Sequence, residues 1–236
     1  MQRQQGMSTF GALLLAAALA LSGWWLAGAL LKFRTGDRYV TVKGLAEREV
    51  PADLVIWPIT FTLTGNDLTA LYGQIQANAQ QIAAFLKAQG LESAEQSLST
   101  PKIQDFEAEG YRQERAPNRY KAEVAYTVRS PEVPAVKKAM RASGELVKGG
   151  VALAPWGAAP EFLYTKLNDL KPALLADATQ NARRAAEQFA KDSDSAVGRI
   201  RSANQGQISI EDRDAGTPDV KKVRVVTTVE YELESR

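Results

Sequence analysis

Residues 54–86 read LVIWPITFTLTGNDLTALYGQIQANAQQIAAFL, and the apolar period changes within this stretch. Over residues 54–64, large apolar side chains alternate with smaller residues, which is typical of a β-strand with one buried face. After Asn66 or Asp67, either of which can cap a helix, apolar residues recur at helical spacing until Gly90. A strand that leads directly into a long amphipathic helix predicts an α+β domain.

Further strands and a short helix are predicted around this unit. Residues 39–44, 97–106 and 120–128 have strand patterns. Ser130-Pro131 has the form of a helix cap followed by proline at the first helical position, so we expect a short helix from there to about Val147. Gly149-Gly150 would end that helix.

The second half of the chain repeats this order. A strand is predicted at 161–165, a long helix from Asn168 or Asp169 to about Lys191, and strands at 198–210 and 220–233. In the last strand, alternate residues from Val223 to Leu233 share one face.

The two long helices also begin with the same tripeptide, Asn66-Asp67-Leu68 and Asn168-Asp169-Leu170. We therefore predict two strand–helix–strand–strand repeats within one domain at 39–235, with sub-halves at about 39–148 and 151–235. Antiparallel strands with the long helices on one face would form it.

An uncharged apolar run of 22 residues, Phe10–Leu31, precedes the domain. As a helix it would span roughly 33 Å, enough for the hydrocarbon core of a bilayer. A small-residue cleavage pattern occurs at Ala18–Ala20, but cutting there would leave the apolar residues 21–31 on the mature chain. We favour an uncleaved transmembrane signal anchor over a cleaved signal peptide.

This anchor predicts a cytoplasmic N-terminus at 1–9 and a linker at 32–38. The flanking charges alone do not fix the orientation. Three cations follow the run, at Lys32, Arg34 and Arg38, and Arg3 precedes it. The positive-inside rule would then keep the domain in the cytoplasm, yet long domains translocate largely regardless of flanking charge.

Composition restricts the chemistry. The chain has 29 Lys and Arg against 27 Asp and Glu, with no basic cluster interleaved with aromatics, so we predict no nucleic-acid partner. It has no Cys and no His, which excludes thiol nucleophiles, Ser-His-Asp triads and Cys/His zinc sites. We predict a protein that is not an enzyme, with no catalytic, cofactor-binding or metal-binding residues.

Two charged clusters are candidate binding sites. The first is a loop of carboxylates and arginines, either a ligand site or a solvated loop; its members are Glu107, Glu109, Arg112, Glu114, Arg115 and Arg119. The second, Glu211, Asp212 and Asp214, offers oxygen ligands for a hard cation. A hairpin turn ending at residues 216–218 explains the second cluster better, and a solvated loop explains the first.

Four residues are candidates for contacts between subunits. Pro58 lacks an amide hydrogen, which indicates a strand edge or a bulge. Trp156 lies in a loop between the halves, where it either packs over the edge of the core, which we favour, or anchors a partner. Ala182 and Ala186 lie on an alanine-rich helix, whose small side chains allow close packing on its own sheet or on another subunit. We favour packing on its own sheet.

Several segments together resemble a known family. They are Val40–Gly44, a hydrophobic strand beginning at Asp53, Asn78-Ala79 on a helix, an alanine-rich helix at 182–190, Val197–Ile200 and Ile208–Ile210. This order is similar to the SIMPL-domain family of bacterial envelope proteins, a domain of unknown function. Its members include a periplasmic immunogenic protein and a periplasmic protein tied to oxidative-stress defence. The resemblance covers roughly residues 38–235.

The resemblance implies an extracytoplasmic domain that assembles into rings or larger cages, with no established reaction. It favours a single-pass protein of the bacterial inner membrane with its C-terminal domain in the periplasm. The resulting hypothesis is a non-enzymatic, homo-oligomeric envelope protein with a structural or stress-related role. The alternative is a monomeric ligand-binding or sensory module that works with another envelope protein.

Overall fold

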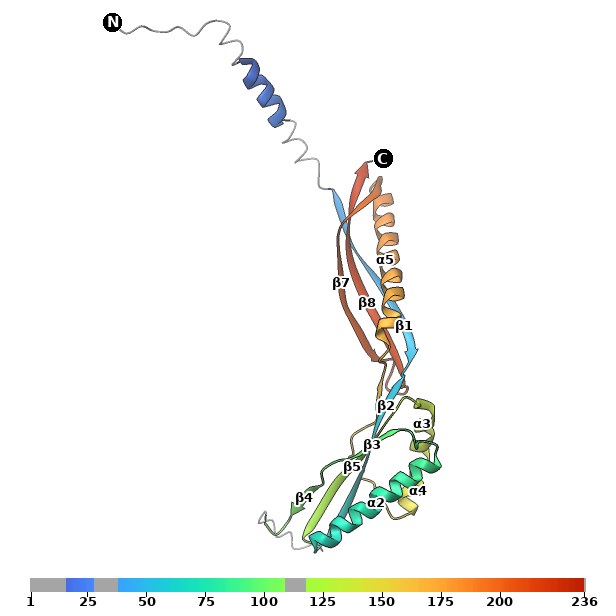
Figure 1. Cartoon of the computed structure of the whole chain (residues 1–236). Helices are drawn as coiled ribbons and strands as arrows, with labels where there is room; N and C mark the ends of the chain where they lie inside the picture. Colours follow the sequence, from blue (N-terminus) through green and yellow to red (C-terminus); the bar gives the residue numbers. More distant parts are fainter. Residues whose placement is uncertain (1–15, 28–37, 109–117, 236) are drawn as a thin grey trace, which may run out of the picture. The chain divides into compact units, whose positions relative to one another are not determined.

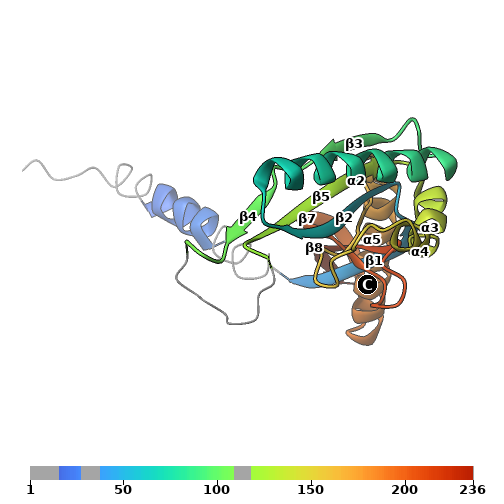
Figure 2. The same cartoon turned by 90° about the horizontal axis from the view of Figure 1, so that it is seen from below.

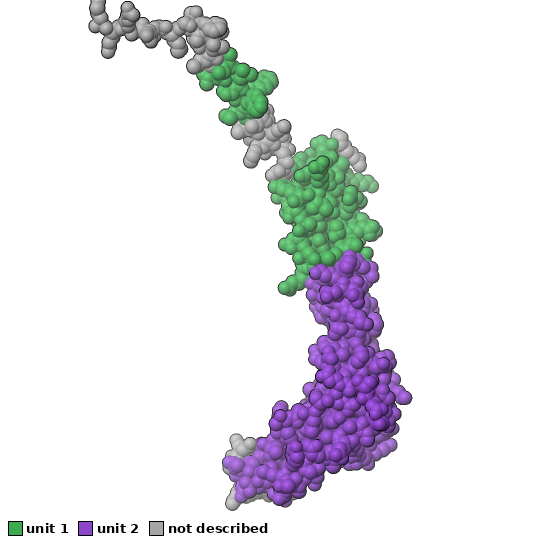
Figure 3. All heavy atoms as spheres, viewed as in Figure 1, with its two compact units in different colours: residues 1–46, 175–207, 225–236 green, residues 47–174, 208–224 purple. Residues whose placement is uncertain are grey.

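A computed structural model describes residues 16–27, 38–108 and 118–235 of the chain (Figure 1). The chain forms two compact units (Figure 3). Unit 1 comprises Met1–Ala46, Leu175–Gln207 and Val225–Arg236, and unit 2 comprises Glu47–Leu174 and Ile208–Arg224. The units are discontinuous in the chain and so differ from the predicted sub-halves.

Unit 2 contains a five-stranded sheet in the order β3-β5-β2-β6, with β4 also paired to β5. At its centre, β2 (Leu54–Gly65) and β5 (Tyr120–Ser130) pair antiparallel along their whole lengths. The short strand β6 (Glu161–Leu163) pairs with the start of β2, and β3 (Glu95–Leu98) and β4 (Lys102–Asp105) pair with β5. These pairings are all antiparallel, which confirms the predicted α+β class.

The strand predicted at 97–106 is interrupted and forms β3 and β4. Ser97 pairs with Thr127, whereas Lys102 pairs with Glu123. The segment from β3 to β4 therefore contains one residue more than the stretch of β5 that it faces. Pro101 lies in this interruption. Because proline cannot donate a ladder hydrogen bond, a break at this point is expected.

The helix α2 (Leu68–Ala88) packs on β2 and β5 (Figure 2). It begins as predicted, because the Asp67 carboxylate accepts a 2.7 Å hydrogen bond from the backbone N–H of Ala70. The buried face of the helix follows the predicted helical period and consists of Leu71, Ile75, Ala79, Ile82, Phe85 and Leu86.

The prediction that Ser130 caps the next helix is wrong. Ser130 is still the last residue of β5, and its hydroxyl accepts a hydrogen bond from the N–H of Glu132. Glu132 is the residue before α3 (Val133–Arg141), and Pro134 rather than Pro131 lies in the first turn. The predicted single helix is also divided, since α4 (Gly144–Lys148) follows separately.

Unit 1 contains parts of a three-stranded sheet in the order β1-β8-β7, with α5 lying beside it (Figure 1). The elements are β1 (Tyr39–Pro51), α5 (Leu167–Asp192), β7 (Ser195–Asp212) and β8 (Val220–Ser235). Ala182 and Ala186 of α5 pack in a buried cluster with Val42, Val229 and Tyr231.

Gly44 explains why α5 is rich in alanine. A Cβ at residue 44 would lie 1.8 Å from the carbonyl oxygen of Ala178 and 2.6 Å from the backbone nitrogen of Ala182. The Asn181 side chain also donates a 2.8 Å hydrogen bond to the Leu45 carbonyl. The backbones of strand and helix therefore touch, which requires glycine on β1 and small residues on α5.

This packing confirms the favoured interpretation of the alanine-rich helix, and it removes two of the candidate subunit contacts. Ala182 and Ala186 are both fully buried within unit 1. Their small side chains serve the approach of α5 to its own sheet, so neither has surface to offer a second copy.

The predicted anchor lies partly outside the described residues. Among those that are described, no helix combines the length and the apolar character needed to cross a membrane. Residues 16–27 form a helix with exposed side chains. The rest of the predicted anchor, at 10–15 and 28–31, lies outside the described residues, as do the predicted N-terminus at 1–9 and most of the linker, at 32–37.

Candidate functional site

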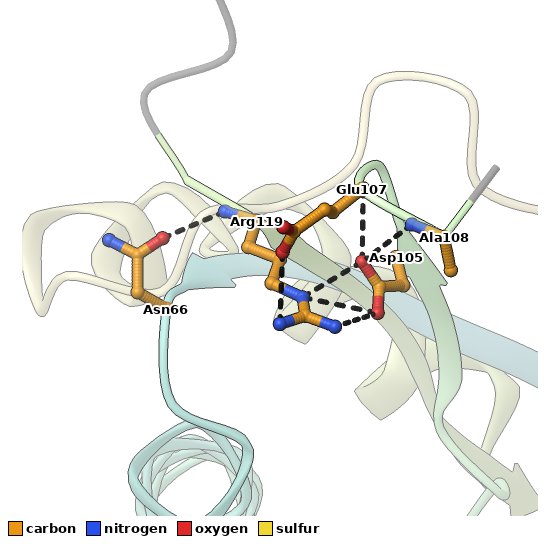
Figure 4. Close-up of polar contacts among 5 residues, drawn as sticks. All are labelled: Asn66, Asp105, Glu107, Ala108 and Arg119. Atoms are coloured by element: carbon orange, nitrogen blue, oxygen red, sulfur yellow. Dashed lines mark hydrogen bonds and ion pairs between the residues drawn. The ribbon is translucent and has the colours of Figure 1, made fainter. Parts of the chain in front are cut away.

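The first charged cluster lies where β4 ends and β5 begins (Figure 4). Asp105 and Tyr120 are paired residues of these strands, which brings Arg119 beside the Asp105 carboxylate. The guanidinium binds both oxygens of Asp105, at 3.0 Å from Nε and 2.8 Å from Nη2, and it also contacts Glu107 at 2.9 Å. The hydrogen bonds from Arg119 are the main reason why the pKa of Asp105 lies below its ordinary value.

Backbone groups complete this cluster. Asp105 also accepts hydrogen bonds from the N–H groups of Glu107 and Ala108, and the Asn66 amide oxygen accepts one from the N–H of Arg119. The cluster therefore ties Ala108 to Arg119, the described residues on either side of residues 109–117. Glu109, Arg112, Glu114 and Arg115 lie outside the described residues, and among the described ones Asp105 and Arg119 hold each other rather than an open coordination site.

The second charged cluster is the predicted hairpin turn between β7 and β8. The Asp214 carboxylate accepts hydrogen bonds from the Thr217 hydroxyl at 2.6 Å, from the Gly216 N–H at 2.8 Å and from Arg213 Nε at 3.0 Å. These bonds, with that from Thr217 the largest contribution, lower the pKa of Asp214 to about 2. Within residues 16–27, 38–108 and 118–235, no group of three acidic side chains is placed to hold a metal ion.

A hollow of about 620 Å³ lies beside this hairpin in unit 2. Phe162, Tyr164 and Ile210 supply apolar lining. Lys221, only 8% exposed, forms an ion pair with Asp212 there. The carboxylate of Glu161 also lines the hollow, so apolar and charged side chains are mixed there.

The loop between α4 and β6 carries Trp156. Its first residues are fixed on β2 by hydrogen bonds from the Thr62 N–H to the Ala152 carbonyl and from the Ala154 N–H to the Thr60 carbonyl. Beyond them, Trp156 is 94% exposed. The favoured prediction that Trp156 packs over the edge of the core is therefore wrong, because the ring makes almost no contact with its own chain.

Pro58 lies near this loop but not on an edge strand. β2 is paired on both sides, with β5 along its length and with β6 at Leu54–Ile56. The backbone N–H of Thr62 donates to the loop that carries Trp156. Alternate residues of a strand direct their backbone groups to the same side, so the backbone nitrogen of Pro58 faces the gap between β6 and this loop. Its missing N–H costs no ladder bond there. The edge prediction for Pro58 is thus corrected to a local gap beside a central strand.

The structure brings Pro58 and the Trp156 loop together. Both contribute to one small hollow of about 160 Å³, with Pro58 and Thr60 from β2 and Ala154, Pro155 and Gly157 from the loop. Of the four residues predicted as subunit contacts, Pro58 lines this hollow beside the loop that carries Trp156, whereas Ala182 and Ala186 are buried in unit 1.

A pocket beside α3 was not predicted, and we call it the α3 pocket. It has a volume of about 330 Å³ and is lined by Pro51, Ala52, Val133, Pro134, Lys137, Lys138, Arg141 and Asp219. Lys137 and Asp219 form an ion pair at 2.5 Å, and this hydrogen bond is the main reason why the pKa of Asp219 is lowered. The helical spacing of Pro134, Lys137, Lys138 and Arg141 was the available signal, since such residues share one face of a helix.

The chain was compared with known protein families. The family model described as SIMPL, a protein of unknown function (DUF541), matches residues 40–231, which is most of the chain. No curated protein matches the sequence.

Proposed function

Because the chain belongs to the SIMPL family, whose function is unknown, we propose a function from its surfaces: a non-enzymatic, membrane-anchored domain that assembles into a homo-oligomeric ring or cage in the cell envelope. The role of such an assembly would be structural or stress-related, as the resemblance to envelope proteins implies.

The observation that carries this proposal is the exposure of Trp156. A tryptophan that is 94% exposed leaves a large apolar surface in water, and large aromatic side chains are enriched where proteins bind one another. The residues around it, from Pro155 to Pro160, are all exposed and uncharged. The hydrogen bonds of Ala152 and Ala154 to β2 hold the base of the loop, so little ordering is required when Trp156 is covered.

The carboxylates with lowered pKa values have structural partners. Asp105, Asp214 and Asp219 are the carboxylates whose pKa values are clearly lowered among the described residues, and each is engaged by a neighbouring cation. Asp105 and Asp214 each accept hydrogen bonds from backbone N–H groups of a turn, and Asp219 is paired with a lysine on α3. A general base, by contrast, needs a pKa raised toward neutrality.

The uncharged run at 10–31 supports attachment to the membrane as a single-pass signal anchor. We place the domain in the periplasm, on the outer side of the inner membrane, as the family resemblance implies. Membrane attachment would also raise the effective concentration of the domains for one another, so that weak contacts suffice for assembly.

Light scattering on the full chain in detergent tests the proposal. After subtraction of the micelle, the particle should have a mass several times the 25.7 kDa of one chain. A particle with the mass of one chain would contradict self-assembly.

One observation favours the alternative, a monomeric ligand-binding module that works with a membrane partner. It is the hollow of about 620 Å³ beside Lys221 and Asp212. Under this alternative the chain is monomeric, and a small molecule from envelope extracts raises its unfolding temperature. Asp212→Asn, which removes the charge facing Lys221, should then abolish that rise.

A further inference from the structure

We propose that Trp156 of one copy inserts into the α3 pocket of a neighbouring copy. This inference rests on the proposed self-assembly and names the two surfaces that meet. Both belong to unit 2, so each copy presents one loop and one pocket in a fixed arrangement.

The α3 pocket suits an indole ring. Pro51, Ala52, Val133 and Pro134 provide apolar lining, and its volume of about 330 Å³ is within the usual range for pockets that enclose small ligands, roughly 300–1,000 Å³. Aromatic anchors contribute most to binding where they fill a pocket on the partner surface.

The charges of the two surfaces are also complementary. The pocket carries three cations, Lys137, Lys138 and Arg141, against one carboxylate, Asp219. Asp219 already pairs with Lys137, and within the described residues neither Lys138 nor Arg141 has an acidic partner in ion-pair distance.

The loop of a neighbouring copy can provide partners for Lys138 and Arg141. The face of an indole attracts guanidinium groups, so Trp156 would lie against Arg141. Glu161, the first charged residue after the loop, is exposed and would pair with Lys138.

A second copy fits these features better than a lipid surface does. The loop has no cation from Val151 to Pro160, and the carboxylate of Glu161 would be repelled by anionic headgroups. Because a loop and a pocket are different patches of the same chain, their contact is head-to-tail and can repeat until a ring closes.

Cysteine cross-linking tests the contact directly, because the chain contains no native cysteine. Full-length Ala158→Cys and Lys138→Cys chains, expressed together in membranes, should form a disulfide-linked dimer under mild oxidation. A chain carrying both substitutions should form a ladder of higher species. Ala158→Cys expressed with Ala88→Cys, at an exposed end of α2, is the matched control and should give no dimer between the two variants.

A charge exchange tests the pairing of Glu161 with Lys138. Lys138→Glu alone should weaken assembly of the full chain at least tenfold, measured as the protein concentration at which half of the particles dissociate. Adding Glu161→Lys to the same chain should restore most of the loss, whereas a variant that merely misfolds would not be rescued. Circular dichroism of both variants checks that the fold is kept.

The outcomes separate this inference from the function on which it rests. A monomeric wild-type chain would overturn both. Two results together would overturn the loop-in-pocket contact alone, provided that the wild-type chain is an oligomer. The Lys138→Glu substitution would leave that oligomer intact, and the Ala158→Cys and Lys138→Cys variants would form no disulfide with each other. A fluorophore can also be attached to the thiol of the Ala158→Cys variant in reconstituted vesicles. Quenching of this fluorophore by brominated lipid would place the loop in the bilayer and would overturn the loop-in-pocket contact.

Discussion

Replacing Gly44 by alanine should destabilise unit 1 strongly. The added Cβ would lie 1.8 Å from the Ala178 carbonyl oxygen, whereas ordinary contacts begin at 3.4 Å. The backbone of α5 would have to move by roughly 1.6 Å at this point, since the atoms it meets are backbone atoms that cannot rotate away. That movement would also loosen the contacts of Ala182 with the sheet.

The expected cost is about 3 kcal/mol, the upper end of the range for overpacked cores. This corresponds to a more than hundredfold larger unfolded population of unit 1. Gly73→Ala is the matched control, because Gly73 lies inside α2 and a Cβ there meets nothing within 4 Å. Alanine favours helix over glycine, so this substitution should stabilise by about 0.5–1 kcal/mol.

Urea denaturation followed by circular dichroism measures both changes, and hydrogen exchange assigns them to segments. In the Gly44→Ala chain, amides of α5 and β1 should exchange faster while those of α2 remain protected. A Gly44→Ala chain that unfolds at the wild-type urea concentration would refute the close backbone contact, as would a Gly73→Ala chain that is destabilised as much as Gly44→Ala.

Three further predictions concern the hairpin and the N-terminal segment. The pKa of Asp214 is lowered to about 2 from its ordinary 3.8, so its contribution to stability is present above pH 4 and is lost as the pH falls from about 4 to 2. The NMR chemical shift of the Asp214 carboxyl carbon should titrate near pH 2. A titration midpoint near pH 4 would show that the turn contacts are absent. Alkaline phosphatase fused after the last residue should be active in cells, and activity only for a cytoplasmic reporter would mean the reverse topology. Sequencing of the mature protein should find residues 10–31 still attached, and a start at Leu21 would show a cleaved signal peptide instead.

The regular elements could be predicted because periodicity depends on local sequence. The alternation in β2 and the helical spacing in α2 each follow from one buried face, and the buried residues match. In β8 the predicted inward face is likewise buried at Val223, Val225, Thr227, Val229 and Tyr231. Helix starts are harder to predict, since Ser130 has the chemistry of a cap but is retained by the last pairing of β5.

The surfaces could not be predicted in the same way. Whether Trp156 is covered depends on which distant residues approach its loop, and the hydrogen bonds of Ala152 and Ala154 to β2 decide where that loop lies. The α3 pocket likewise joins Pro51 and Asp219 to one face of a helix, and these segments are far apart in the chain. The role of Gly44 became visible only when α5 was placed against β1.

The central claim is that the chain assembles through Trp156, and sedimentation of the full chain in detergent tests it most directly. Wild type and Trp156→Ala should be compared over a dilution series, because a side chain that is 94% exposed can be removed without disturbing the fold. We predict that the wild-type chain is an oligomer. The protein concentration at which half of the particles dissociate should be at least tenfold higher for Trp156→Ala than for wild type. A wild-type monomer, or identical oligomers for both chains, would contradict the claim.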